Sequence, residues 1–290
     1  MNKTVSICLI IVLSILTLVL TGLFIFLMSG NSFNWSFSFN TYSEKLVESK
    51  EVSNVASLNV DSQNVDVLFE KSNDDKVYIE LYSENNVDHN IDVVDSKVNV
   101  KFYDKEVFRF FKKNSRILIK FPENYENELV INSTTGDIKF QSFEKLSPII
   151  KLETGDIKAD KLNEVKITST TGDIKISELN AINCKTVTGD VKINRVNIAN
   201  IHGTTGDVKI QEINYSADIT LTTGNVKITK FDVKENSSIN LTTGDVKIES
   251  HSGAYIETTN NVGDVKLNNN DRTLEKTLKI SVRTGDIKVN

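Results

Sequence analysis

Residues 171–176 read Thr-Gly-Asp-Ile-Lys-Ile, and close variants of these six residues occur nine times between residues 135 and 289. Successive glycines of the motif lie 17 to 22 residues apart, which is too short for a two-helix repeat and fits one coil of a β-solenoid. The spacing therefore predicts an all-β stack of about nine coils. The motif glycines are Gly136, Gly155, Gly172, Gly189, Gly206, Gly224, Gly244, Gly263 and Gly285.

Hydrophobic residues alternate on both sides of each glycine, as they do in strands with one face toward a core. The predicted inward pairs after the glycine are Ile138/Phe140, Ile157/Ala159, Ile174/Ile176, Val191/Ile193, Val208/Ile210, Val226/Ile228, Val246/Ile248, Val265/Leu267 and Ile287/Val289. A second inward column, five residues before the glycine, contains Ile131, Ile150, Ile167, Cys184, Ile201, Ile219, Thr258, Ile239 and Ile280. Each coil is thus predicted to hold two strands that share one core.

The corner residues suit a structural role. Glycine is predicted at positive φ, and the carboxylate of the next residue is predicted to accept hydrogen bonds from nearby turn amides. Eight of the nine repeats have Asp there, and the ninth has Asn225, which keeps an acceptor oxygen but has no charge. This exception favours hydrogen bonding over ionic chemistry at the corner.

A lysine follows two residues after each of these positions and shares their outward face. One interpretation is a charged surface for a polyanion such as a wall polymer or a lipid headgroup, and the other is a solvated sheet face. The lysines of this column are Lys139, Lys158, Lys175, Lys192, Lys209, Lys227, Lys247, Lys266 and Lys288.

The start of the chain predicts a membrane anchor. Residues 7–28 are almost entirely apolar, and about 22 residues span about 33 Å as a helix, enough to cross a bilayer. Lys3 places the short tail 1–6 in the cytoplasm and the rest of the chain outside the cell membrane. A cleaved signal peptide is the alternative. Residues 29–51 are predicted as a juxtamembrane linker with aromatic residues suited to a lipid interface.

The remaining chain divides into atypical β coils or a cap at 52–128 and the repeat solenoid at 129–290. Because the chain ends five residues after Gly285, the last coil is predicted to have an open edge that pairs with a second copy or a partner strand. Segment 105–113 is predicted to be a loop or a partner-binding patch, and residues 258–262 form an irregular coil.

Composition narrows the function classes. The net charge of −5 gives no support for nucleic-acid binding. Cys8 and Cys184 are not expected to form a disulfide, and no cofactor, metal site or catalytic residue is predicted. A polysaccharide-acting enzyme is disfavoured because the repeated carboxylates have near-identical surroundings. A cation-binding β-roll is disfavoured by the lysine that follows each acid.

The strand–proline junction at 117–122, residues 129–139 and the serial Gly-Asp coils resemble a bacterial family of β-repeat outer domains labelled "putative adhesins", which are toast-rack-like and of unknown function. The resemblance covers about 52–290. It implies a stacked β-solenoid in membrane-linked proteins near envelope-stress systems, without established catalytic residues. The predicted function is therefore a membrane-anchored binding or scaffold module at the cell envelope, with an envelope protein or an anionic wall polymer as partner.

Overall fold

The computed structural model describes residues 45–84, 87–104, 115–268 and 270–290. The predicted membrane segment, the linker up to residue 44 and the loop at 105–113 lie outside these residues, apart from the linker's last residues, which enter the first strand. Within the described residues, no helix has the length and apolar character needed to cross a membrane. Residues from Tyr42 to Asn290 form one compact unit, and its fold is all-β.

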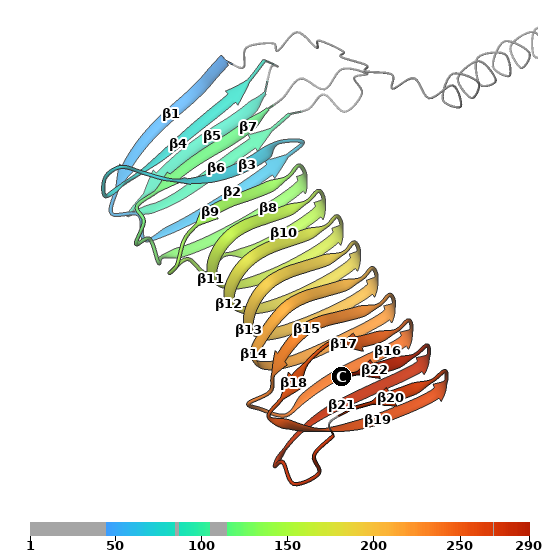
Figure 1. The fold of residues 1–290 in the computed structure, drawn as a ribbon. Coiled ribbons are helices and arrows are strands. Elements are labelled where there is room, and N and C mark those ends of the chain that lie inside the picture. The colour runs from blue at the N-terminus through green and yellow to red at the C-terminus, as the bar shows by residue number, and fades with distance from the viewer. Residues whose placement is uncertain (1–44, 85–86, 105–114, 269) are drawn as a thin grey trace, which may run out of the picture. The chain divides into compact units, whose positions relative to one another are not determined.

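The middle of this unit is a regular β-solenoid (Figure 1). Its strands are β8 (Glu128–Thr135), β9 (Ile138–Ser142), β10 (Ile149–Thr154), β11 (Ile157–Thr171), β12 (Ile174–Thr188), β13 (Val191–Thr205) and β14 (Val208–Thr223). The four long strands run from one glycine corner to the next and bend on the way. The first half of β11 pairs with β9 and its second half with β10, so one strand serves both halves of a coil. Nine corners bound about eight turns.

Parallel, in-register pairing stacks equivalent residues of successive repeats. Ile157 pairs with Ile174, which pairs with Val191, and the next inward column is likewise aligned. These aliphatic side chains are at most a few per cent exposed and join one continuous hydrophobic cluster. Cys184 lies within this column, and burial raises the pKa of its thiol to about 12. The predicted inward columns are confirmed for every coil except that of Gly263.

The distal coils do not stack in the order of the sequence. Their strands are β15 (Val226–Asp232), β16 (Ser237–Thr243), β17 (Val246–Ile248), β18 (His251–Ser252), β19 (Ala254–Val262), β20 (Val265–Leu267), β21 (Lys276–Thr284) and β22 (Ile287–Val289). Strands β21 and β22 pair with β16 and β17 on one side and with β19 and β20 on the other. The last coil of the sequence is thus inserted between the two coils that precede it.

This insertion corrects the predicted open edge at the C-terminus. The Gly285 coil is covered on both sides, and the open edge belongs to β19 and β20 (Figure 1). The prediction that Val265 is buried in the core is also wrong: Val265 is 42% exposed, whereas Ile287 at the same position of the inserted coil is 1% exposed.

A difference in apolar content accounts for the order. The inserted coil brings Leu278, Ile280 and Val282 to its inward column, while the end coil brings Ile256, Thr258 and Asn260 to the same positions. Burial of the more apolar coil releases more hydrophobic free energy. The interval of 22 residues before Gly285 is the longest of the series and supplies chain for the return.

The opposite end of the solenoid is closed by a cap in which parallel coils are followed by antiparallel strands. The strands are β1 (Lys45–Ser53), β2 (Ser57–Gln63), β3 (Asp66–Lys71), β4 (Lys76–Ser83), β5 (Asp88–Val94), β6 (Lys97–Tyr103) and β7 (Arg116–Phe121). Strands β2 and β3 form a coil between β8–β9 and β6–β7, with parallel pairing on both sides. Strand β4 then pairs antiparallel with β7, β1 with β4, and β5 with β6.

Aromatic side chains fill the core at this closed end. The Phe69 ring stacks on Phe140 with centroids 4.4 Å apart and lies 5.7 Å from Phe121, which stacks on Tyr125 at 4.2 Å. Burial of these rings replaces the aliphatic ladder where the coils become irregular. Stacked aromatic rings are thus part of the core at the closed end, whereas aliphatic side chains predominate in the core of the inner coils.

Candidate functional site

The glycine corners have a backbone that other residues adopt poorly. At Gly172 φ is +136°, and a Cβ atom there would lie 1.8 Å from the carbonyl oxygen of Gly155 in the neighbouring coil. Glycine is therefore required both for its positive φ and for the close approach of stacked corners. This explains why the motif glycine never varies across nine repeats.

The aspartates after these glycines form a ladder of hydrogen bonds between coils. The Oδ1 atom of Asp137 accepts from the amide of Asp156 at 3.1 Å, and Asp156 accepts from the amide of Asp173 at 3.0 Å. Asn225 continues the ladder by accepting from Asp245 at 2.9 Å. The sequence correctly predicted an acceptor role but assigned the wrong donor, because the donating amide belongs to the next coil.

The ladder extends beyond the residues that the motif identified. Asp66 begins it by accepting from the amide of Asp137 at 2.9 Å, although its corner has Asn64 and Val65 in place of Thr and Gly. At the other end Asp245 accepts from Asp286, and Asp286 accepts from Asp264. A spacing search for Asp-Val after a turn residue would have found Asp66.

The ladder lowers the pKa of two of its carboxyl groups, those of Asp173 and Asp207. The amide of Asp190 holds the pKa of Asp173 below its ordinary value of 3.8, against the effect of desolvation, and Lys175 lowers it further. For Asp207 desolvation opposes the shift, but hydrogen bonds from Asn225 and Lys209 prevail and the pKa is again lowered. Ionised acceptors make stronger hydrogen bonds to amides than neutral ones do.

The lysine column lies outward and about half exposed, and its charge is compensated locally. Lys139, Lys158, Lys175, Lys192 and Lys209 each lie 3.0 to 3.6 Å from the Asp two residues earlier. Where Asn225 removes that partner, Glu249 lies 2.9 Å from Lys227 and 3.3 Å from Lys247. Such exposed pairs contribute about 0 to 1 kcal/mol each.

A shallow groove of ≈ 510 Å³ follows this column over four coils. Its lysines are Lys139, Lys158, Lys175 and Lys192, and its far side includes Asp160 and Asn194. The in-register pairing of the strands repeats an ammonium group in each coil at about the 4.8 Å strand spacing. The groove thus presents regularly spaced ammonium groups along this face.

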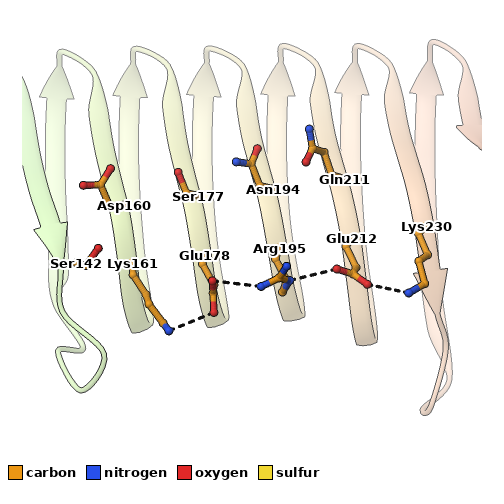
Figure 2. Close-up of a pocket in the computed structure, with 10 residues that line it drawn as sticks. All are labelled: Ser142, Asp160, Lys161, Ser177, Glu178, Asn194, Arg195, Gln211, Glu212 and Lys230. Atoms are coloured by element: carbon orange, nitrogen blue, oxygen red, sulfur yellow. Dashed lines mark hydrogen bonds and ion pairs between the residues drawn. The ribbon is translucent and has the colours of Figure 1, made fainter.

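A second charged column, six residues after the glycine, was missed by the sequence reasoning (Figure 2). It alternates in sign along the stack. Lys161 lies 3.3 Å from Glu178, Arg195 lies 3.3 Å from Glu178 and 3.1 Å from Glu212, and Lys230 lies 2.8 Å from Glu212. Alignment of the repeats on their glycines would have shown the alternation.

This charge ladder borders a groove of ≈ 580 Å³ that also contains Ser142, Asp160, Ser177, Asn194 and Gln211 (Figure 2). Lys230 and Arg195 lower the pKa of Glu212, and the Glu144 and Glu178 carboxylates raise the pKa of Lys161. The charged forms of Glu212 and Lys161 are therefore favoured. The groove offers paired charges and amide groups, which suit polar binding.

Among the described carboxyl groups, those whose pKa the fold displaces do not include a candidate general acid. Every carboxyl group in the described residues whose pKa the fold displaces has it displaced downward, as at Glu80, Glu144 and Glu249. A general acid needs the opposite displacement. Among the same residues, no group of three or more His, Cys, Asp or Glu side chains could hold a metal ion.

A structural comparison matches this chain to solved bacterial structures. One described as a "putative adhesin" from Bacteroides fragilis is 16% identical, covers 86% of this chain and 98% of its own, and has a TM-score of 0.47. A "putative lipid binding protein" from Parabacteroides distasonis is 13% identical, covers 84% and 96%, and has a TM-score of 0.48. No curated protein is significantly similar to this chain.

The family model described as Toastrack DUF4097 matches residues 55–290, which include the N-terminal coils, the carboxylate ladder and all nine glycine corners. The chain belongs to the Toastrack DUF4097 family.

Proposed function

We propose that this chain is a membrane-anchored, outward-facing scaffold or binding module of the bacterial cell envelope. The observation that carries the proposal is the uniformity of the solenoid's sides: the same corner, ladder and ion pairs recur from coil to coil. Repetition gives a rigid spacer of about 4.8 Å per coil and no individual catalytic environment. The apolar segment 7–28 supports the anchor, and the adhesin-type names of similar structures fit the envelope address.

The anchor and orientation can be tested in cells that express the full chain with a C-terminal tag. We expect the protein in the membrane fraction, with the tag digested when protease is added to cells whose wall has been opened. Deletion of residues 7–28 should release the protein from membranes. A tag that stays protected until the membrane is lysed would contradict the proposed orientation.

A second candidate function is binding of an anionic wall polymer along the lysine groove. The periodic ammonium groups of Lys158, Lys175 and Lys192 favour this candidate, whereas their Asp partners reduce the net field. The probe is immobilised poly(glycerol phosphate), eluted with rising salt. Lys158→Gln with Lys175→Gln should lower retention and its salt dependence. The matched control replaces Lys161 and Lys230, which removes the same charge from the other column; equal loss in both would reject a specific groove.

A further inference from the structure

The end coil leaves open the backbone positions that every other coil fills. In the preceding coils the backbone amides of the motif glycine and of the residue two positions later donate hydrogen bonds to carbonyl oxygens of the next coil. The amide of Gly244 donates to the carbonyl of Thr284, and that of Val246 to the carbonyl of Asp286, both at 2.9 Å. In the same way, the amides of Gly285 and Ile287 donate to the carbonyl oxygens of Val262 and Asp264. Gly263 and Val265 occupy these positions in the end coil, and β20 pairs only with β22 among the described strands.

The same edge has two exposed apolar side chains. Val265 is 42% exposed because no coil covers it, and Val262 is 62% exposed. Val262 stands where the other eight repeats have Thr. Exposed apolar edge strands pair readily with other strands, which is why natural sheets usually protect them.

The neighbouring edge strand is partly protected. Asn270 accepts from the amide of Ile256 at 2.8 Å and donates to the carbonyl of Ile256 at 2.9 Å. The side-chain amide thus takes the place of a strand along the middle of β19. These two hydrogen bonds limit the edge that is free for strand pairing to β20 and the adjoining end of β19.

The sequence of β20 is complementary to itself in the antiparallel direction. A twofold axis at Val265 places Asp264 of one copy opposite Lys266 of the other, twice, and Val265 opposite Val265. Asp264, Val265 and Lys266 are all exposed. Opposite charges across a strand pair are favourable, and the central pair exchanges two backbone hydrogen bonds.

Within the described residues, the other end of the solenoid has a different kind of edge. Its outer strands are the antiparallel β1 and β5, and β1 has an irregularity between Leu46 and Glu48. On β1 the exposed charged residues Lys45 and Glu51 lie in the same strand as the exposed apolar Leu46 (54%) and Val47 (36%). Charged and irregular edges discourage pairing. The complement of the β20 edge is therefore another β20 edge.

We propose that the free edge of β20 binds a second copy of this chain in an antiparallel, twofold contact centred on Val265. The contact pairs the β20 edge of one copy with the β20 edge of the other and leaves neither edge free, so the assembly closes as a dimer and does not grow into a fibre. It is small, so we expect a weak dimer. With the proposed anchor preceding β1, the dimer would join two anchored solenoids through their far ends; that consequence rests on the proposed function, whereas the dimer does not.

A charge-swap series on the full chain in mild detergent tests the contact by sedimentation equilibrium. Asp264→Lys or Lys266→Asp alone places like charges opposite each other twice and should weaken the dimer about tenfold. The double variant restores opposite charges and should recover wild-type affinity. Lys185→Asp on an inner coil is the charge control and should leave the affinity unchanged. A wild-type chain that stays monomeric at high concentration, or a double variant no better than the single ones, would overturn the proposal.

Disulfide trapping gives a second readout that does not depend on membrane insertion. Residues opposite each other in a hydrogen-bonded antiparallel pair have Cα atoms about 5.5 Å apart, within reach of a disulfide. In a Cys8→Ser background with Cys184 buried, Val265→Cys should give a covalent dimer on mild oxidation. Val187→Cys, 49% exposed on an inner coil, is the matched control. Equal trapping at both sites would show random collision and refute the contact.

Discussion

The inner coils and the end coil share one sequence motif but differ in what that motif does. Val191 lies between two neighbouring coils and is 1% exposed, whereas Val265, at the equivalent inward position of the end coil, is 42% exposed. The carboxylate of Asp173 has a donor in the next coil, and Asp264 ends the ladder. The energy of a repeat therefore depends on its place in the stack as much as on its residues.

The largest expected difference lies at the corner glycines. A Cβ at Gly189 would lie 2.0 Å from the Gly172 oxygen with φ at +139°, so Gly189→Ala should destabilise the solenoid by more than about 3 kcal/mol. Gly263→Ala has a similar clash, 2.0 Å from the Gly285 oxygen, but only the end coil must move. Chemical denaturation should show a global loss for the first variant, and hydrogen exchange should show fraying confined to 254–268 for the second. Equal global losses would contradict the comparison.

A cavity in the inner core should have the next largest effect. Ile193→Ala removes a buried side chain that is packed on both sides and should lower the free energy of unfolding by about 3 kcal/mol. Val265→Ala removes an exposed one and should lower it by less than about 0.5 kcal/mol. The denaturation midpoints of the two variants measure the difference, and similar midpoints would argue against the end-coil position of Val265.

The carboxylate ladder should show the same contrast on a smaller scale. Asp156→Ala removes the acceptor of the Asp173 amide and should lower the free energy of unfolding by about 1 kcal/mol. Asp156→Asn should lower it less, because Asn225 already serves as acceptor in the native ladder. Asp264→Ala should have no measurable effect on stability. An Asn variant as unstable as the Ala variant would show that charge, and not hydrogen bonding, holds the corner.

The pH profile follows from the same ladder. The pKa of Asp173 is lower in the folded chain than its ordinary value of 3.8, so its stabilising contribution is present above that value and is lost as pH falls through the folded pKa. Unfolding midpoints measured from pH 6 down to pH 2 should decline below about pH 4. Asp173→Asn should make the decline shallower, and an unchanged profile would remove Asp173 from the account.

The smallest effect is expected on the outer charge ladder. Arg195 contacts two glutamates but is half exposed, so Arg195→Ala should lower the free energy of unfolding by less than about 1 kcal/mol. The loss should shrink further in high salt, where exposed pairs are screened. A large, salt-insensitive loss would indicate that this column carries stability that its exposure does not suggest.

Most of the fold was predictable because the information is local and repeated. Period-two alternation assigned inward residues such as Ile157 and Ile174, and the recurring glycine indicated corners with positive φ. The candidate site was less predictable. The acceptor role of the aspartates follows from Asn225, but the donor in the next coil and the coil of Asp66 depend on how repeats stack. The predicted binding role of the lysine column, the cell-surface location and the partners stay predictions.

The sequence by itself determined the solenoid architecture, the corners and the parity of each strand, since these depend on residues a few positions apart. Only the tertiary structure decided that the Gly285 coil is stacked between the Gly244 and Gly263 coils, because that order depends on which of two similar coils gains more from burial. The physical reason is that stacked repeats are chemically alike, so a period in the sequence defines each layer but not its neighbours. The exposed edge of β20, and with it the proposed dimer, follows from that order.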